Sequence, residues 1–201
     1  MLTTPHSNEV LQLGVLGLGT HFGIEIEFEM NSKDKTPSLS DFLFLWDNNK
    51  YELEKYFVIT YDSSLINGVE IVSKPMTFYY HSLILPKLYQ WIKEIENDLA
   101  LTITNTTGMH IHIDKSGVNN ENLEWIINYL QRNEKEIDLL AGRKQNQYCL
   151  RMFEDEKYLY SKSSALRISD QTVELRIFST FYDPENIIQI LGIIERILSS
   201  N

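Results

Sequence analysis

Hydrophobic and polar residues alternate along residues 21–31, HFGIEIEFEMN. The even-numbered positions from Phe22 to Met30 are apolar, and glutamate occupies positions 25, 27 and 29. Because successive side chains of a strand point to opposite faces of a sheet, this pattern predicts a strand with one buried face. Shorter runs of the same kind predict further strands at residues 67–75, 107–114, 163–169 and 171–179.

Apolar residues with helical spacing occupy three longer segments, residues 79–97, 121–141 and 184–198. Gly142 follows the second segment and suits the left-handed residue that ends many helices. Asp183 is a good N-cap for the third segment, with proline at the first helical position. The sequence therefore predicts about three helices beside the strands.

Residues 42–64 are harder to assign, and we interpret them as one or two strands around an Asp-Asn-Asn turn.

Strands with one apolar face, combined with about three helices, predict an α+β fold. In this fold the helices pack on one face of an antiparallel-rich sheet and leave the other face polar and open. A chain of 201 residues suits one domain, which we assign to residues 20–201. Residues 1–19 are expected to form an N-terminal arm or an added edge strand.

The composition of the chain limits the kinds of partner and the cellular compartment that we expect. The net charge of −10 disfavours binding to nucleic acid or to anionic membranes. Cys149 is the only cysteine, so no intrachain disulfide forms, which fits a cytoplasmic protein. The apolar run at residues 10–19 is too short for a membrane helix and lacks the preceding basic residues of a signal peptide.

Acids, histidines and arginine share the polar positions of the predicted strands. These positions hold Glu25, Glu27, Glu29, Glu70, His110, His112, Glu174 and Arg176. Each pattern alone is typical of a solvated face or of a cross-strand ion pair. Together on one face, however, the acids would repel one another unless cations neutralised them.

The residue types at these positions favour Mg²⁺, or alternatively Mn²⁺. Carboxylates with one histidine suit these ions better than a structural zinc site, which usually contains cysteine. Hard cations on such a face typically bind phosphates as well. The arginines available to bind phosphate oxygens as charge-assisted forks are Arg176, Arg143, Arg151 and Arg167.

Five short motifs follow one another along most of the chain: GIEIEFE (23–29), YDSSLINGVEIVSKPM (61–76), TGMHIHID (107–114), AGRKQNQYC (141–149) and TVELRIFST (172–180). In this order they resemble the amidoligase family, compact relatives of the catalytic domain of glutamine synthetase and glutamate–cysteine ligase. The resemblance implies a curved antiparallel sheet whose concave face binds ATP and two or three Mg²⁺ ions. It also implies ATP-dependent joining of a carboxylate to an amine.

The resemblance assigns roles to individual residues. Glu27 and Glu70, with Asp62 nearby, resemble one metal centre, and Glu25, His110 and Glu174 resemble the other. Arg176 resembles the arginine that meets the transferred phosphoryl group. His112 resembles a histidine near the nucleotide phosphates, and Arg143 an arginine that faces substrate or phosphate. Glu29 has no firm counterpart and is left out of the predicted site.

The predicted function is therefore an ATP-dependent carboxylate–amine ligase that forms an amide or isopeptide bond through an acyl phosphate. Its substrates would be small-molecule or peptide carboxylates and amines. Glutamine synthesis itself is not expected, because the loop that supplies an acid to the ammonium pocket is not recognisable. The alternatives are a metal-dependent phosphotransferase on the same fold and a non-catalytic nucleotide-binding module. A zinc hydrolase built on the two histidines ranks lower because it lacks a clear third neutral ligand.

Overall fold

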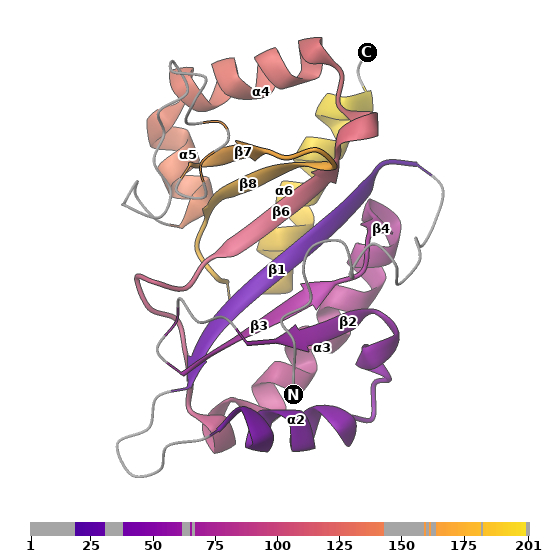
Figure 1. Ribbon diagram of the computed structural model, residues 1–201, viewed down its shortest axis with the longest axis vertical. Helices are drawn as coiled ribbons and strands as arrows, with labels where there is room; N and C mark the ends of the chain where they lie inside the picture. The colour runs from indigo at the N-terminus through magenta and orange to yellow at the C-terminus, as the bar shows by residue number, and fades with distance from the viewer. Residues whose placement is uncertain are drawn as a thin grey trace.

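One antiparallel sheet runs through the molecule in the computed structural model (Figure 1). The structure describes residues 19–30, 38–61, 65, 67–142, 159, 161, 164–181 and 183–199. The main strands lie in the order β2, β3, β1, β6, β8, β7, and two short strands, β4 and β5, also pair with β1. Their bounds are β1 His21–Met30, β2 Phe57–Thr60, β3 Gly68–Ser73, β4 Met76–Thr77, β5 Leu101–Thr102, β6 Met109–Asp114, β7 Leu166–Ile168 and β8 Thr172–Phe178.

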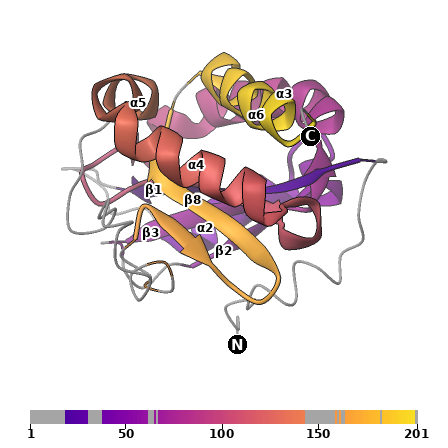
Figure 2. The same ribbon diagram turned by 90° about the horizontal axis from the view of Figure 1, so that it is seen from above.

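Helices cover one face of this sheet, as the sequence predicted. Helices α3 (Phe78–Leu99) and α6 (Pro184–Ser199) pack against each other on that face, as Figure 2 shows. Helices α4 (Asn120–Arg132) and α5 (Glu134–Ala141) lie at the β7 and β8 end of the molecule. The α+β architecture with an antiparallel sheet is therefore confirmed.

The core lies between the sheet and its helices. Phe22, Ile24, Ile26 and Phe28 of β1 are completely buried there, on the side that the alternation predicted. Apolar residues of neighbouring strands continue this layer, because Ile24 pairs with Ile111 and Ile26 with Ile71 and Met109. Because side chains alternate along β1, its glutamates project from the opposite face of the sheet.

Residues 42–64 are only partly extended, so the interpretation as one or two strands was wrong for their first half. Helix α2 (Leu39–Asp47) begins at Ser38, which forms a capping box with Asp41. Phe42 and Trp46, one helical turn apart, pack edge-on against Trp91 of α3, with ring centroids 5.5 and 5.1 Å away. A cap and a tertiary contact thus override the β-propensity of these aromatic residues. The short 3₁₀ helix Leu53–Lys55 follows, and within the described residues 42–61 the strand is limited to Phe57–Thr60.

The helix predicted over residues 121–141 is divided at Asn133. Its backbone leaves helical geometry (φ −118°, ψ 38°), and its side-chain amide donates to the carbonyl of Tyr129 at 3.0 Å. This local bond competes with the helical pattern, so α4 ends and α5 begins there. Gly142 ends α5 with φ 69°, as predicted. The carboxylate of Asp183 accepts a hydrogen bond from the Glu185 N–H at 3.0 Å at the start of α6.

Residues 1–18 of the predicted N-terminal arm lie outside the described residues. Among the residues that the structure does describe, no helix is both long enough and apolar enough to cross a membrane.

Candidate active site

The register of four strands gathers the predicted polar residues on the open face of the sheet. On β1, Glu25 lies opposite His110 of β6, and Glu27 lies opposite Glu70 of β3. On the other side of β6, His112 lies opposite Glu174 of β8. Directly opposed residues of an antiparallel pair project from the same face, so these side chains converge in space.

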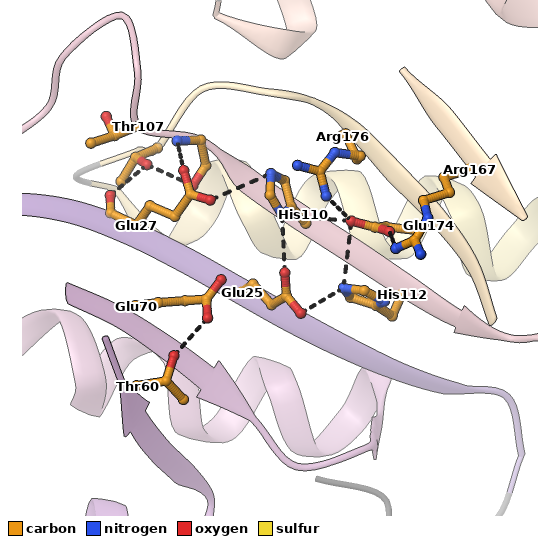
Figure 3. Close-up of polar contacts among 12 residues, drawn as sticks. Glu25, Glu27, Thr60, Glu70, Thr107, His110, His112, Arg167, Glu174 and Arg176 are labelled. Carbon is orange, nitrogen blue, oxygen red and sulfur yellow. Dashed lines mark hydrogen bonds and ion pairs between the residues drawn. The ribbon is translucent and has the colours of Figure 1, made fainter. Parts of the chain in front are cut away.

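Glu25 lies at the centre of this group, between the two histidines (Figure 3). Nδ1 of His110 lies 3.0 Å from its Oε2, and Nε2 of His112 lies 2.9 Å from its Oε1. The two imidazoles come from the same face of β6, two residues apart, as the strand period requires. The two histidines of the His-x-His pattern therefore contact the same carboxylate from two sides.

Glu174 is the second buried acid of the group, with 2% of its surface exposed. Its Oε1 accepts a short hydrogen bond from Arg176, and its Oε2 accepts one of 3.1 Å from Arg167. The same Oε1 lies 3.7 Å from His110 Nδ1 and 4.0 Å from His112 Nε2. Two guanidinium groups thus compensate the burial of this carboxylate.

The charges of these groups are coupled. Burial alone would lower the pKa of His112, but the attraction and hydrogen bonding of Glu25, together with the attraction of Glu174, outweigh it and raise this pKa to about 9. Burial would likewise raise the pKa of Glu25, but His112 and His110 hold it well below its usual value. Burial would also raise the pKa of Glu174, but the attraction of His112, Arg176 and His110 together lowers it. Histidine and arginine therefore supply positive charge beside the acids of this face.

The other two acids of the predicted site have different environments. Glu70 accepts a hydrogen bond of 2.7 Å from the hydroxyl of Thr60 on β2. Glu27 is buried, and its Oε2 accepts a 2.6 Å hydrogen bond from the backbone N–H of Gly108. Its Oε1 faces Nε2 of His110 at 3.7 Å. These contacts hold the carboxylates of Glu70 and Glu27 near the other residues of the cluster.

Two overlapping groups of side chains have the geometry of cation sites. Ligand atoms of Glu25, Glu70 and His110 lie within 4.8 Å of one another, and so do those of Glu25, His112 and Glu174. Each group offers two carboxylates and one imidazole, a donor set that suits Mg²⁺ or Mn²⁺. Glu25 belongs to both groups, so it is positioned to bridge two cations.

This grouping differs in detail from the assignment that the resemblance implied. That assignment paired Glu27 with Glu70, and it gave His112 to phosphate and not to a metal. In the structure His112 lies in one of the two cation groups, and Glu27 stands beside them with a bond to the backbone. The individual roles remain predictions. Asp62 and Arg143, also predicted for the site, lie outside the described residues.

The structure shows two contacts to the acids of the site that the sequence did not predict. Arg167 holds Glu174 from β7, and Thr60 holds Glu70 from β2. Arg167 and Thr60 both occupy polar-face positions of their strands. The sequence of such a short strand, however, does not indicate which strand will pair with it. Their positions could be recognised only once the strand order was known.

Comparison with known proteins places this fold and its polar face among related proteins. Among solved structures, the chain is similar to a cryo-EM structure of Plasmodium falciparum glutamine synthetase, with a TM-score of 0.57 and 11% sequence identity. The match covers 90% of this chain and 52% of that chain, so this protein spans about half the length of that relative.

A family comparison gives the narrower identification. The model of the family described as "Putative amidoligase enzyme" matches residues 21–191. The chain therefore belongs to this amidoligase family, which confirms the resemblance found in the sequence and supports a ligase-type function. No curated protein matches the chain.

Proposed function

We propose that this protein is an ATP-dependent carboxylate–amine ligase that uses two or three divalent cations, Mg²⁺ or Mn²⁺. The observation that carries the proposal is the convergence of Glu25, Glu70, Glu174, His110 and His112 in two adjoining cation groups. Cations held side by side with arginine nearby suit a triphosphate, whose oxygens need positive charge on several sides. Membership of the amidoligase family supports the same reaction type.

The proposed reaction has two steps. The carboxylate of one substrate attacks the γ-phosphorus of ATP, and ADP leaves with the bridging oxygen, so that an acyl phosphate forms. The amine of the second substrate then attacks the acyl carbon and displaces phosphate, which leaves an amide or isopeptide bond. Phosphorylation is needed because a free carboxylate is a poor electrophile.

Each side chain has a part in this proposal. Glu25, Glu27, Glu70, Glu174 and His110 hold the cations, which when bound neutralise charge on the phosphate oxygens. Because Glu25 joins both cation groups, it fixes their relative position.

The basic residues would act on the phosphates. Arg176 turns from Glu174 to the transferred phosphoryl group, and Arg167 keeps the Glu174 carboxylate in place when it does so. His112, which belongs to one of the cation groups, is proposed to border the nucleotide phosphates as well. Asp62 and Arg143 are proposed to complete the site next to the substrates.

The test is a search for condensation products by mass spectrometry. The wild-type protein is incubated with a panel of carboxylates and amines, Mg²⁺ and ATP, beside the variants Glu25→Gln and Glu29→Gln. We expect an ATP-dependent product lighter than its two substrates by one water molecule, lost in Glu25→Gln and retained in Glu29→Gln. Glu29 is the matched control because it lies on the same strand and face, where it accepts a hydrogen bond from Thr106.

Two outcomes would contradict the proposal. A phosphorylated carboxylate that accumulates without any amide would assign the protein to phosphotransfer instead. Absence of both ATP turnover and Mg²⁺–ATP binding in the wild type would indicate a module without catalytic function.

A further inference from the structure

A cavity of about 670 Å³ adjoins the acid–histidine cluster on the open face of the sheet. Glu25 and His112 belong to both the cavity and the cluster. From there the cavity extends toward the first residues of β1 and the turn between β7 and β8. Most of the lining residues are polar or charged, and Val72 and Pro75 add apolar side chains. The proposed reaction as described above leaves this space unassigned.

Gly23 makes room for the cavity. It occupies the polar-face position of β1 immediately before Glu25, opposite His112, where another residue would carry a side chain over the sheet. Its backbone is ordinary extended strand, so no left-handed conformation requires glycine there. A Cβ atom at this position would lie 3.4 Å from the Cβ of His112, in normal contact. Alanine therefore fits at position 23, whereas a larger side chain would extend into the cavity.

Asp114 supplies a free acceptor on the cavity wall. Its Oδ1 accepts hydrogen bonds from the backbone N–H and the hydroxyl of Ser116, at 2.9 and 2.8 Å. Its Oδ2 accepts none from the residues that the structure describes. Lys115, which also lines the cavity, donates instead to the carbonyl of Ser169 at 3.1 Å. Asp170 adds a second carboxylate at the turn between β7 and β8.

The cavity therefore has two chemically different ends. The end at Asp114 and Asp170 carries two carboxylates against the single cation of Lys115, so it disfavours phosphate but suits neutral hydroxyl donors. The end at His112 leads to the cation groups and to Arg176, which attract phosphate. An elongated ligand with hydroxyl groups beside an apolar ring system and phosphates at one end satisfies both ends and the apolar part of the lining.

We propose that Gly23 and Asp114 determine nucleotide specificity in this protein. The nucleoside of a ribonucleoside triphosphate lies in the cavity that Gly23 leaves open, and Asp114 Oδ2 accepts a hydrogen bond from a ribose hydroxyl. The phosphates extend past His112 to the cations. This inference rests on the proposed function, because it takes the triphosphate of ATP as the ligand of the neighbouring cluster.

The first experiment separates the nucleoside from the phosphates. Binding of Mg²⁺–ATP and of Mg²⁺–tripolyphosphate is measured by calorimetry for the wild type, Gly23→Ala and Gly23→Val. We expect Gly23→Val to weaken ATP binding by about 10-fold or more, because its methyl groups occupy the space of the nucleoside. Tripolyphosphate lacks a nucleoside, so its affinity should change less than about 2-fold, which also shows that the variant is folded. Gly23→Ala should have a smaller effect on ATP.

The second experiment tests the ribose contact with ATP, 2′-deoxy-ATP and 3′-deoxy-ATP. A hydrogen bond to a carboxylate predicts that the wild type binds ATP about 10-fold more tightly than at least one deoxy analogue. In Asp114→Asn this preference should fall below about 3-fold. The asparagine Oδ1 still accepts the Ser116 hydrogen bonds, but its Nδ2 cannot accept one from the ribose. Tripolyphosphate binding should again be unchanged.

The outcomes distinguish this inference from the proposed function. If the wild type binds neither ATP nor tripolyphosphate, the proposed function itself fails. If it binds both, and Gly23→Val binds ATP as tightly as the wild type, the cavity holds another ligand, such as the acceptor amine, and the inference is overturned while the function stands. Equal affinity of the wild type for ATP and both deoxy analogues would overturn the role of Asp114.

Discussion

The two faces of strand β1 are both largely buried, yet they are built from opposite chemistry. On one face, Phe22, Ile24, Ile26 and Phe28 are completely inaccessible and belong to the hydrophobic core. On the other, Glu27 and Glu29 are 5% exposed, and Glu25 is clamped between two histidines. Burial of apolar groups stabilises the fold, whereas burial of carboxylates costs free energy unless each is paired. The same ten residues therefore serve stability on one face and chemistry on the other.

On the polar face, hydrogen bonds and ion pairs limit the free-energy cost of burying carboxylates. Glu29 is paired with a threonine hydroxyl, Glu27 with a backbone N–H and Glu174 with two arginines. Under the proposed function, these groups are arranged for binding rather than for maximal stability, as is common at functional sites. Substitutions on the two faces should accordingly separate stability from ligand binding.

The largest effect is expected on the apolar face. Phe28→Ala removes a fully buried ring and leaves a cavity, so the free energy of unfolding should fall by about 3–5 kcal/mol. Urea unfolding followed by tryptophan fluorescence measures this change. A loss below about 1 kcal/mol would show that the core does not depend on this face of β1.

Glu25→Gln should give the largest effect on the polar face. Removal of an indirect supporting partner of a metal ligand typically costs 10–100-fold in affinity, so loss of a carboxylate shared by two cation groups should cost about 100-fold or more for Mn²⁺. Stability should fall by less than in Phe28→Ala, because His112 then releases its proton and is not left as an unpaired charge. Calorimetry with Mn²⁺ and urea unfolding, on the same samples, check both parts. Unchanged Mn²⁺ affinity would exclude Glu25 as a ligand.

A change of pH should have a smaller effect on the free energy of unfolding, measured in the presence of a chelator. The folded pKa of His112, about 9, lies above its value of about 6.5 in the unfolded chain. Its contribution to stability is therefore fully present below pH 6.5 and is lost as the pH rises through about 9. We expect a decrease on the order of 2 kcal/mol between pH 6.5 and pH 9.5.

His112→Asn is the control for this pH dependence, since the decrease should largely disappear in that variant. Urea unfolding in the presence of a chelator measures both proteins. An equal decrease in both would assign the effect to other groups. On the acid side the lowered pKa of Glu25 acts in the opposite sense, because its contribution is present above about 4.5 and is lost as the pH falls through its folded pKa.

The smallest effect is expected for Glu29→Gln. The glutamine keeps an acceptor for the Thr106 hydroxyl, so stability should change by less than about 1 kcal/mol. Mn²⁺ affinity should remain within about 2-fold of the wild type, because Glu29 lies outside both cation groups. A loss of Mn²⁺ affinity as large as that of Glu25→Gln would extend the site along the whole strand.

Several features of the fold were predictable because they depend on local pattern. The alternation in β1 assigned each residue to its face, and the spacing of His110 and His112 placed both on the same side as Glu25. Gly142 and Asp183 marked a helix end and a helix start through their own backbone and side-chain chemistry. Local sterics and hydrogen bonding act within a few residues, so they can be recognised without knowledge of the fold.

Helix α2 was not predictable in the same way. Its aromatic residues favour strands in isolation, and their helical arrangement is stabilised by contact with Trp91, more than forty positions further along the chain. The division at Asn133 likewise depends on a side-chain bond that competes with a continuous apolar stripe. In both places a specific contact outweighed the average preference of the residues.

By itself, the sequence determined which residues are apolar or polar on each strand, the family to which the chain belongs and the set of acids and histidines available for a site. Only the tertiary structure decided which of these residues meet. The order of strands in the sheet placed Glu25 between His110 and His112, turned Glu27 to Gly108, brought Arg167 to Glu174 and left a cavity over Gly23. The physical reason is that side-chain parity follows from the geometry of neighbouring residues, whereas strand neighbours and register follow from long-range pairing across the whole chain.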